Sequence, residues 1–442
     1  MDTTLHTRRQ FLRTSMLGAA ASWTLPVFLE QTFFALDAMA ADAATQAVTG
    51  KDGTILVVLQ MAGGNDGLNM VVPFADDAYY RARPKLGIPA DQILKLDAYA
   101  GFNPKLTGLK SLFDEGHLSV IQGVGYPNPN RSHFRSTEIW QTASDADRNE
   151  NEGWLGKYFD NCCAGADPTV GVAIGDQMPQ AFVARTPTGV TFSKPEQFRW
   201  MPSEKRNGPM SAEEVFFRQL NGATDEDAAP PANDGGSIAA IPGSTKANQS
   251  AVDFLQRTAL DAQLSSDKIL AIARKTKSKM PYPAGQLAAS LSLIARMIAG
   301  GLPTRVYYAS QGGFDTHAGQ LGTHDRLMTD LNAALSAFVA DLKEQGNFDR
   351  VLLMTFSEFG RRVAENANGG TDHGAAAPMF VLGGAVKAGL FGKYPSLSDL
   401  DQGDLKFNTD FRSIYGTILD RWLKAPSELV LGHKFSSLPI IG

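Results

Sequence analysis

Near-continuous runs of apolar residues recur along the chain and predict the strands of one buried sheet. Two of the clearest begin at Thr54 and Leu118, and each is followed by a loop rich in Gly, Asn or Pro. Short apolar runs rich in β-branched residues and bounded by such loops are typical of strands covered on both faces. The predicted strands lie at 54–61, 118–123, 170–174, 181–185, 190–192, 305–309, 350–356 and 379–382.

Segments with helical periodicity separate these runs. A long amphipathic segment at about 323–345 joins the strands at 305–309 and 350–356, which makes a β-α-β unit with parallel strands and a right-handed crossover. The alternation predicts an α/β fold, a three-layer α/β/α sandwich around a mainly parallel sheet. Further helices are expected from near Ser132 and over about 247–277, 284–299 and 410–423.

The first forty residues have the order of features of an export signal. Arg8 and Arg9 precede an uncharged stretch at 14–29, and the small residues of 38–40 supply a cleavage site. Paired arginines before a short apolar run are what the twin-arginine translocation machinery reads. We therefore expect 1–40 to be a twin-arginine signal peptide and the folded protein to be periplasmic or secreted.

The remainder is expected to be a linker at 41–53 and a single α/β domain at 54–442. A helical and loop insertion is predicted at about 201–300, because 221–246 is rich in Ala, Pro, Gly, Asp and Ser without an apolar period. A net charge of −5 does not favour nucleic acid as a partner. No segment of the mature chain is apolar enough to predict a membrane span. The only two cysteines are adjacent, which excludes a disulfide scaffold.

Polar and charged residues gather just after the predicted strands. The carboxyl ends of parallel strands share one edge of a sheet, where ligand sites usually form, so these residues are expected to converge. Carboxylates mixed with imidazoles suit Zn²⁺ or Mn²⁺, and an all-oxygen subset would suit Mg²⁺ or Ca²⁺. The candidate metal ligands are Asp66, Asp315, His317, Glu358, Asp372 and His373, and Ser132 supplies a hydroxyl.

Each candidate also has a structural interpretation. Asp66 lies in an Asn-Asp-Gly turn, where an aspartate often bonds its own backbone. Ser132 stands where a helix begins, so its hydroxyl could be a helix cap. Glu358 could form an ion pair with a neighbouring arginine, and the pair at 372–373 could belong to an ordinary loop.

Five motifs of this chain resemble those of a family of twin-arginine-exported bacterial proteins, domain of unknown function 1501. The resemblance extends through nearly the whole mature chain. That family in turn resembles the alkaline phosphatase and sulfatase superfamily. The motifs are Gly63-Gly64-Asn65-Asp66-Gly67-Leu68-Asn69, Arg131-Ser132-His133-Phe134, Gly313-Phe314-Asp315-Thr316-His317, Ser357-Glu358-Phe359-Gly360-Arg361 and Thr371-Asp372-His373-Gly374.

The resemblance implies roles for individual residues. Asp66 is similar to a metal ligand after the first strand, and Ser132 to a nucleophile at a helix start. Arg135 would then bind the substrate's oxygens. Where the superfamily commonly has an Asp-His dipeptide, this chain has Ser357-Glu358, which removes one imidazole. Asp315 with His317, Glu358 and His373 resemble the remaining ligands.

The activity that the resemblance implies is metal-dependent hydrolysis of phosphate or sulfate esters. The substrate would be a small anionic ester or a polysaccharide. A second hypothesis is a non-catalytic envelope binding protein that retains the fold, since fold alone does not establish chemistry. A third, a metal-independent serine hydrolase, lacks the Gly-x-Ser-x-Gly elbow.

Overall fold

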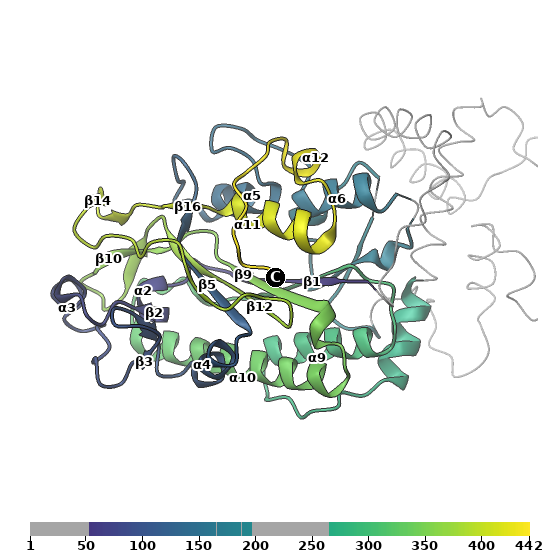
Figure 1. Ribbon diagram of the computed structural model, residues 1–442, viewed down its shortest axis with the longest axis horizontal. Coiled ribbons are helices and arrows are strands. Elements are labelled where there is room, and N and C mark those ends of the chain that lie inside the picture. The colour runs from purple at the N-terminus through teal and green to yellow at the C-terminus, as the bar shows by residue number, and fades with distance from the viewer. Residues whose placement is uncertain (1–52, 165, 187, 197–264) are drawn as a thin grey trace, which may run out of the picture. The chain divides into compact units, whose positions relative to one another are not determined.

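The structure, a computed structural model, describes residues 53–164, 166–186, 188–196 and 265–442 (Figure 1). Every helix and strand named below belongs to one compact unit of the chain. The predicted signal peptide, the predicted linker up to residue 52 and positions 201–264 of the predicted insertion lie outside the described residues. Export and domain organisation therefore stay predictions.

A nine-stranded sheet forms the centre of this unit. β1 (Ile55–Met61) lies in its middle, between β8 (Val306–Gln311) and β9 (Val351–Phe356), and pairs in parallel with both. All seven residues of β1 are buried, as expected for a continuous apolar run covered on both faces. The parallel strands of the predicted β-α-β unit are confirmed, with β1 inserted between them.

One strand runs against the others. β12 (Ala377–Gly383) pairs antiparallel with both β5 (Leu118–Gly125) and β9. β12 therefore begins at the edge where the long parallel strands end. The strand order is β13-β5-β12-β9-β1-β8-β6-β7, with β16 beside β5, and the strands not yet given are β6 (Gly171–Ile174), β7 (Val190–Phe192), β13 (Gly389–Phe391) and β16 (Thr409–Asp410).

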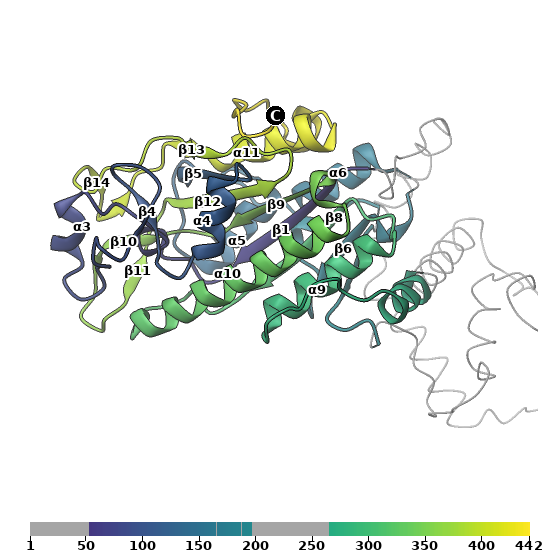
Figure 2. The same ribbon diagram turned by 60° about the horizontal axis from the view of Figure 1, so that its bottom comes forward.

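Helices cover both faces of the sheet, as Figures 1 and 2 show from two directions. The helices on one face are α4 (Thr107–Asp114), α9 (Gln286–Ala299) and α10 (Gln320–Glu344). Those on the other face are α5 (His133–Thr142), α6 (Trp154–Cys162), α11 (Phe411–Thr417), the π-helical turn Ile418–Leu423 and α12 (Ser427–Leu431). The predicted three-layer α/β/α arrangement is confirmed.

Side chains of β1 alternate between the two cores. Ile55, Val57 and Leu59 pack with α9 and α10, whereas Leu56 and Val58 pack on the opposite face. This is the period of two that a pleated strand imposes. α9 falls at the end of the segment predicted as an insertion, yet its apolar side chains belong to the first of these cores.

One predicted strand is wrong. Within 181–185 the chain forms no strand, and a 3₁₀ turn, η2 (Gln180–Phe182), overlaps the start of this segment. Ala181 and Phe182 are buried, so the apolar run reflects burial of a turn rather than strand pairing. No helix among the described residues is long and apolar enough to cross a membrane.

Short elements surround the sheet. A hairpin of β10 (Arg361–Glu365) and β11 (Thr371–His373) precedes β12. The others are α2 (Gly67–Met70), β2 (Val71–Val72), α3 (Asp77–Ala82), β3 (Leu94–Lys95), β4 (Gly101–Phe102), β14 (Leu400–Asp401), β15 (Asp404–Leu405), η1 (Pro168–Val170) and η4 (Phe348–Arg350).

Candidate metal centre

The loops that follow β1, β8 and β9 meet at one edge of the sheet, together with the start of α5 and the β10–β11 hairpin. Two glycines allow these loops to touch through their backbones. A Cβ on Gly63, whose φ is +121°, would lie 2.4 Å from the backbone nitrogen of Asp315. A Cβ on Gly370 would lie 2.3 Å from the carbonyl carbon of His317. Any side chain at either position would push the loops apart.

Arg361 joins the same loops through hydrogen bonds to their backbones. Its guanidinium is buried and donates to the carbonyl oxygens of Gly64 at 2.6 Å, Thr371 at 2.8 Å and Phe314 at 3.0 Å. It also donates to Asp315 Oδ1 at 2.7 Å. One cation therefore ties three loops to one another and holds the carboxylate in place.

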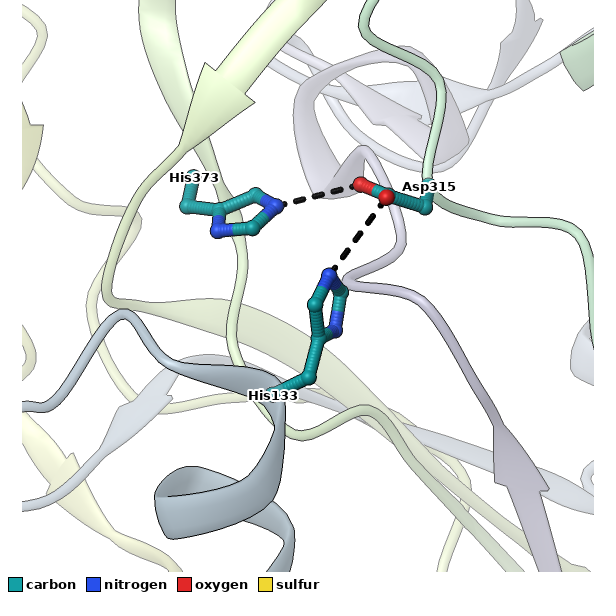
Figure 3. A group of neighbouring side chains, drawn as sticks. All are labelled: His133, Asp315 and His373. Carbon is teal, nitrogen blue, oxygen red and sulfur yellow. Dashed lines mark hydrogen bonds and ion pairs between the residues drawn. The ribbon is translucent and has the colours of Figure 1, made fainter.

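Three imidazoles surround Asp315, and we call His133, His317, His373 and Asp315 the imidazole cluster. Asp315 Oδ1 lies 3.1 Å from Nε2 of both His317 and His373. Asp315 Oδ2 lies 3.5 Å from Nε2 of His133. Figure 3 shows how His133, from the start of α5, and His373, from β11, both point at the carboxylate.

The other ring nitrogen of each imidazole faces an acceptor. Nδ1 of His133 lies 2.9 Å from Glu358 Oε1, and Nδ1 of His373 lies 2.8 Å from the carbonyl oxygen of Arg131. Nδ1 of His317 lies 3.4 Å from Asp372 Oδ1. Carboxylate and carbonyl oxygens only accept, so a hydrogen on each Nδ1 satisfies these contacts, and this tautomer leaves the Nε2 lone pair available to a metal ion. Without a metal, the Asp315 carboxylate beside Nε2 of His373 favours a hydrogen on Nε2 instead.

The Nε2 atoms of His317 and His373 lie only 2.9 Å apart. Two lone pairs facing each other at this distance repel unless a proton or a cation lies between them. Ligating histidines generally use one ring nitrogen for the metal and donate the other N–H to a carboxylate or carbonyl. The donor set of three imidazole nitrogens and one carboxylate therefore fits Zn²⁺. Among the described residues, the group whose ligand atoms all lie within 4.8 Å of one another is His133, Asp315 and His373. His317 lies beside this group, through its contacts with Asp315 and His373.

Asp315 is ionised at neutral pH, and its side chain is 48% exposed. Burial pulls the pKa of this carboxyl upward, but hydrogen bonds from Arg361 and His373 outweigh it and hold the pKa at about 2. The carboxylate is thus available as an anionic ligand across the physiological pH range.

Asp66 lies in a different environment. It is fully buried, and its Oδ2 accepts from Arg83 at 2.6 Å and from Gln320. Burial alone would raise the pKa of Asp66, yet the charge of Arg83 and its hydrogen bond lower it below the ordinary value. The structure therefore places the predicted first-strand ligand in a buried ion pair, outside the group that contains Asp315.

The structure gives Glu358 and Asp372 supporting positions. Glu358 is buried, and its Oε1 accepts from the backbone N–H of Gly63 at 2.8 Å as well as facing His133. The ion pair with a neighbouring arginine, considered above as an alternative, is not the contact that Glu358 makes. Asp372 is exposed, accepts from Asn366 at 3.1 Å and faces His317.

Ser132 and Arg135 also take definite positions. Ser132 is the exposed N-cap residue of α5, but its side chain makes no capping bond. Arg135 pairs with Glu138 at 2.6 Å and donates to the carbonyl of Asp145 at 3.1 Å. The guanidinium of Arg135 is thus bound to α5 itself and to the chain that follows it rather than to the imidazole cluster.

His133 is the member of the cluster that sequence reasoning missed. It lies in the Arg131-Ser132-His133-Phe134 motif, where attention falls on the serine as a nucleophile. The available signal was the position of His133, which begins a helix at the sheet edge where the other members of the cluster lie. A histidine directly after a helix cap is as well placed as the serine to face that edge.

Comparisons with known proteins identify a family. Residues 120–434 match the model of a family described as "Protein of unknown function (DUF1501)". No curated protein matches the chain.

Solved structures match the chain at low identity and with low TM-scores. One is the lipoteichoic acid synthase LtaP from Listeria monocytogenes, 10% identical, covering 88% of this chain and 75% of that one, with a TM-score of 0.33. A sulfatase from Pseudoalteromonas sp. is 12% identical over 94% and 75% of the two chains, with a TM-score of 0.36. The C-terminal periplasmic domain of EptC from Escherichia coli, in complex with Zn, is 9% identical over 77% of each chain, with a TM-score of 0.33.

Proposed function

Since the chain belongs to the DUF1501 family, whose description names no activity, we propose its function from the imidazole cluster: metal-dependent hydrolysis of phosphate or sulfate esters. The observation that carries this proposal is the shared orientation of three imidazoles. Each directs Nε2 toward Asp315, and His317 and His373 also direct Nε2 toward each other, while each Nδ1 faces an acceptor. This arrangement is the one that metal-ligating histidines adopt.

The residues that would hold the ion are His133, Asp315, His317 and His373. Zn²⁺ is favoured by three imidazoles with one carboxylate, and Mn²⁺ is the alternative. When bound, such an ion supplies Lewis-acid polarisation of an ester oxygen. Glu358 and Asp372, which the sequence suggested as ligands, would instead orient His133 and His317.

Ser132 remains the proposed nucleophile. Its hydroxyl lies at the start of the ten-residue helix α5, where unpaired backbone N–H groups favour anionic oxygens. Attack by Ser132 Oγ on phosphorus or sulfur would release the alcohol, and water would then cleave the enzyme ester. Arg131 positions His373 through its backbone carbonyl, while its guanidinium, like that of Arg135, is already paired, with Asp404 at 2.6 Å.

A second candidate function is that of a non-catalytic metal-binding protein of the envelope. The observation that favours it is the engagement of Arg135 by Glu138 and by backbone carbonyls, because this removes one predicted substrate contact. Such a protein would bind the ion and a partner without turning over esters.

Metal analysis combined with hydrolysis of an aryl phosphate and an aryl sulfate tests the proposal. We expect the purified protein to bind one Zn²⁺, and Asp315→Asn and His133→Ala each to weaken that affinity at least a hundredfold. His433→Ala, at an exposed position outside the cluster, is the matched control and should bind normally. Metal binding without hydrolysis of either ester would favour the second candidate. Failure of wild-type protein to bind Zn²⁺ or Mn²⁺ would sink both.

Export through the twin-arginine machinery is the further part of the proposal. It is supported by the paired arginines Arg8 and Arg9 ahead of an uncharged stretch. Replacing both with lysine should retain the protein in the cytoplasm. Unchanged amounts in the periplasm or medium after this replacement would contradict it.

A further inference from the structure

Behind the imidazole cluster lies a buried polar network centred on Gln320, the first residue of α10. Gln320 has no exposed surface, and both ends of its amide are bonded. Nε2 donates to Asp66 Oδ2. Oε1 accepts from Thr316 Oγ1 at 3.0 Å and from Thr371 Oγ1 at 2.6 Å. One side chain therefore joins the loops that follow β1 and β8 to the hairpin that precedes β12.

The two threonines flank the residues of the cluster. Thr316 stands between Asp315 and His317, and Thr371 is two residues before His373. Thr316 is buried while both of its neighbours are exposed, as alternation along an extended chain requires. The backbone N–H of Thr371 donates to the carbonyl of Thr316 at 3.1 Å. Gln320 thus binds the buried side of the two segments, at Thr316 and Thr371, whose other side carries the residues of the imidazole cluster.

The direction of the Gln320 amide is set by charge. Ionised Asp66 can only accept, so the amide must turn its NH₂ toward Asp66 and its oxygen toward the threonines. Arg83, fully buried and 2.6 Å from Asp66 Oδ2, keeps that carboxyl ionised. A reversed amide would face two oxygens across the Asp66 contact, which is repulsive.

We propose that Gln320 is a positioning residue for the metal centre. By accepting from Thr316 and Thr371 it fixes the separation of the segments that carry His317 and His373. The ion pair of Asp66 and Arg83 would then serve the site from a distance, as the anchor of that amide. This inference rests on the proposed function of the cluster as a metal site.

The test is Gln320→Met, which keeps the volume of the side chain and removes its three hydrogen bonds. We expect the Kd for Co²⁺, used as a visible probe of the Zn²⁺ site, to rise about tenfold, in the range found for residues that support metal ligands. The absorption bands of bound Co²⁺ should also change. The control is Gln311→Met, since Gln311 is a buried amide that donates to the carbonyl of Leu327 at 3.1 Å. We expect Gln311→Met to retain the Co²⁺ affinity and spectrum.

A metal-free measurement separates this inference from the proposed function. Ring-nitrogen NMR of the metal-free protein should show altered ring signals of His317 and His373 in Gln320→Met. Wild-type Kd, spectrum and ring signals in Gln320→Met would overturn the positioning role. If wild-type protein bound no Co²⁺ while the variant still altered the ring signals, the metal site would be refuted and the positioning of the two segments supported.

Discussion

Asp66 and Asp315 follow two strands that lie side by side in the sheet, and each has a buried arginine as partner, yet their environments are opposite. Asp66 has no exposed surface and bonds Arg83 and Gln320. Asp315 is half-exposed and faces three imidazoles as well as Arg361. Strand-end position alone therefore does not define a ligand. Exposure and the kind of neighbour decide whether a carboxylate forms a buried ion pair, as Asp66 does, or faces a cluster of imidazoles, as Asp315 does.

The largest expected effect, on the free energy of unfolding, comes from removing the buried partner of Asp66. Arg83→Met leaves a buried carboxylate without its countercharge and should lower the free energy of unfolding by about 3–5 kcal/mol. Urea denaturation measures it. Arg326→Met is the control, because the 3.9 Å pair of Arg326 with Asp330 is exposed and should contribute no more than about 1 kcal/mol.

A double variant keeps that prediction testable if Arg83→Met does not fold. Asp66→Leu combined with Arg83→Met removes both charges, so it should recover a large part of the lost stability. Equal destabilisation by the single and double variants would contradict the view that unpaired charge is the cause.

A smaller effect, on metal affinity, is expected from the carboxylates that face the imidazoles around Asp315. Glu358→Gln keeps the volume of the side chain but removes the charge that faces Nδ1 of His133. The affinity for Zn²⁺ should fall about tenfold, or about 1.4 kcal/mol, as judged by competition with a chelator. Asp372→Asn, at an exposed residue 3.4 Å from His317, should change it less than threefold. A larger loss in Asp372→Asn than in Glu358→Gln would reverse the assigned roles.

The smallest effect concerns the acidity of Asp315 in metal-free protein. Its pKa falls from 3.8 to about 2 on folding, so the unfolded chain binds this proton more readily. The stabilising contribution is therefore complete above pH 3.8 and disappears as the pH falls toward 2. Wild type should exceed Asp315→Asn in stability at pH 5, and the difference should shrink between pH 3.8 and 2. A difference that stays constant over this interval would contradict the lowered pKa.

The layered fold could be predicted because its signal is local. β1, β8 and β9 are continuous apolar runs, and α10 carries a helical apolar period between two of them. The prediction at 181–185 failed because burial of a 3₁₀ turn also requires apolar residues, so composition alone cannot distinguish the two. The reversed direction of β12 was not predicted, since direction depends on pairing with distant strands.

The site was predictable only in part for a similar reason. The acidic and imidazole residues near strand ends do converge, as Asp315, His317 and His373 show. Which carboxylate would be neutralised depended on Arg83, seventeen residues after Asp66 and without any motif to mark the pairing. His133 was overlooked because the resemblance directed attention to the adjacent serine. Partners that are far apart in sequence decided each of these roles.

The β10–β11 hairpin has a consequence for redesign. His373 reaches the imidazole cluster from the β10–β11 hairpin, which hydrogen-bonds as its own two-stranded sheet. Its exposed residues, such as Ala364 and Asn368, can therefore be altered without shifting the register of any strand in the nine-stranded sheet, whereas Arg361 and Thr371 must be kept because they join the loops. Substitutions at the exposed positions of this hairpin would change the surface beside His373 and leave the two hydrophobic cores of the sheet intact.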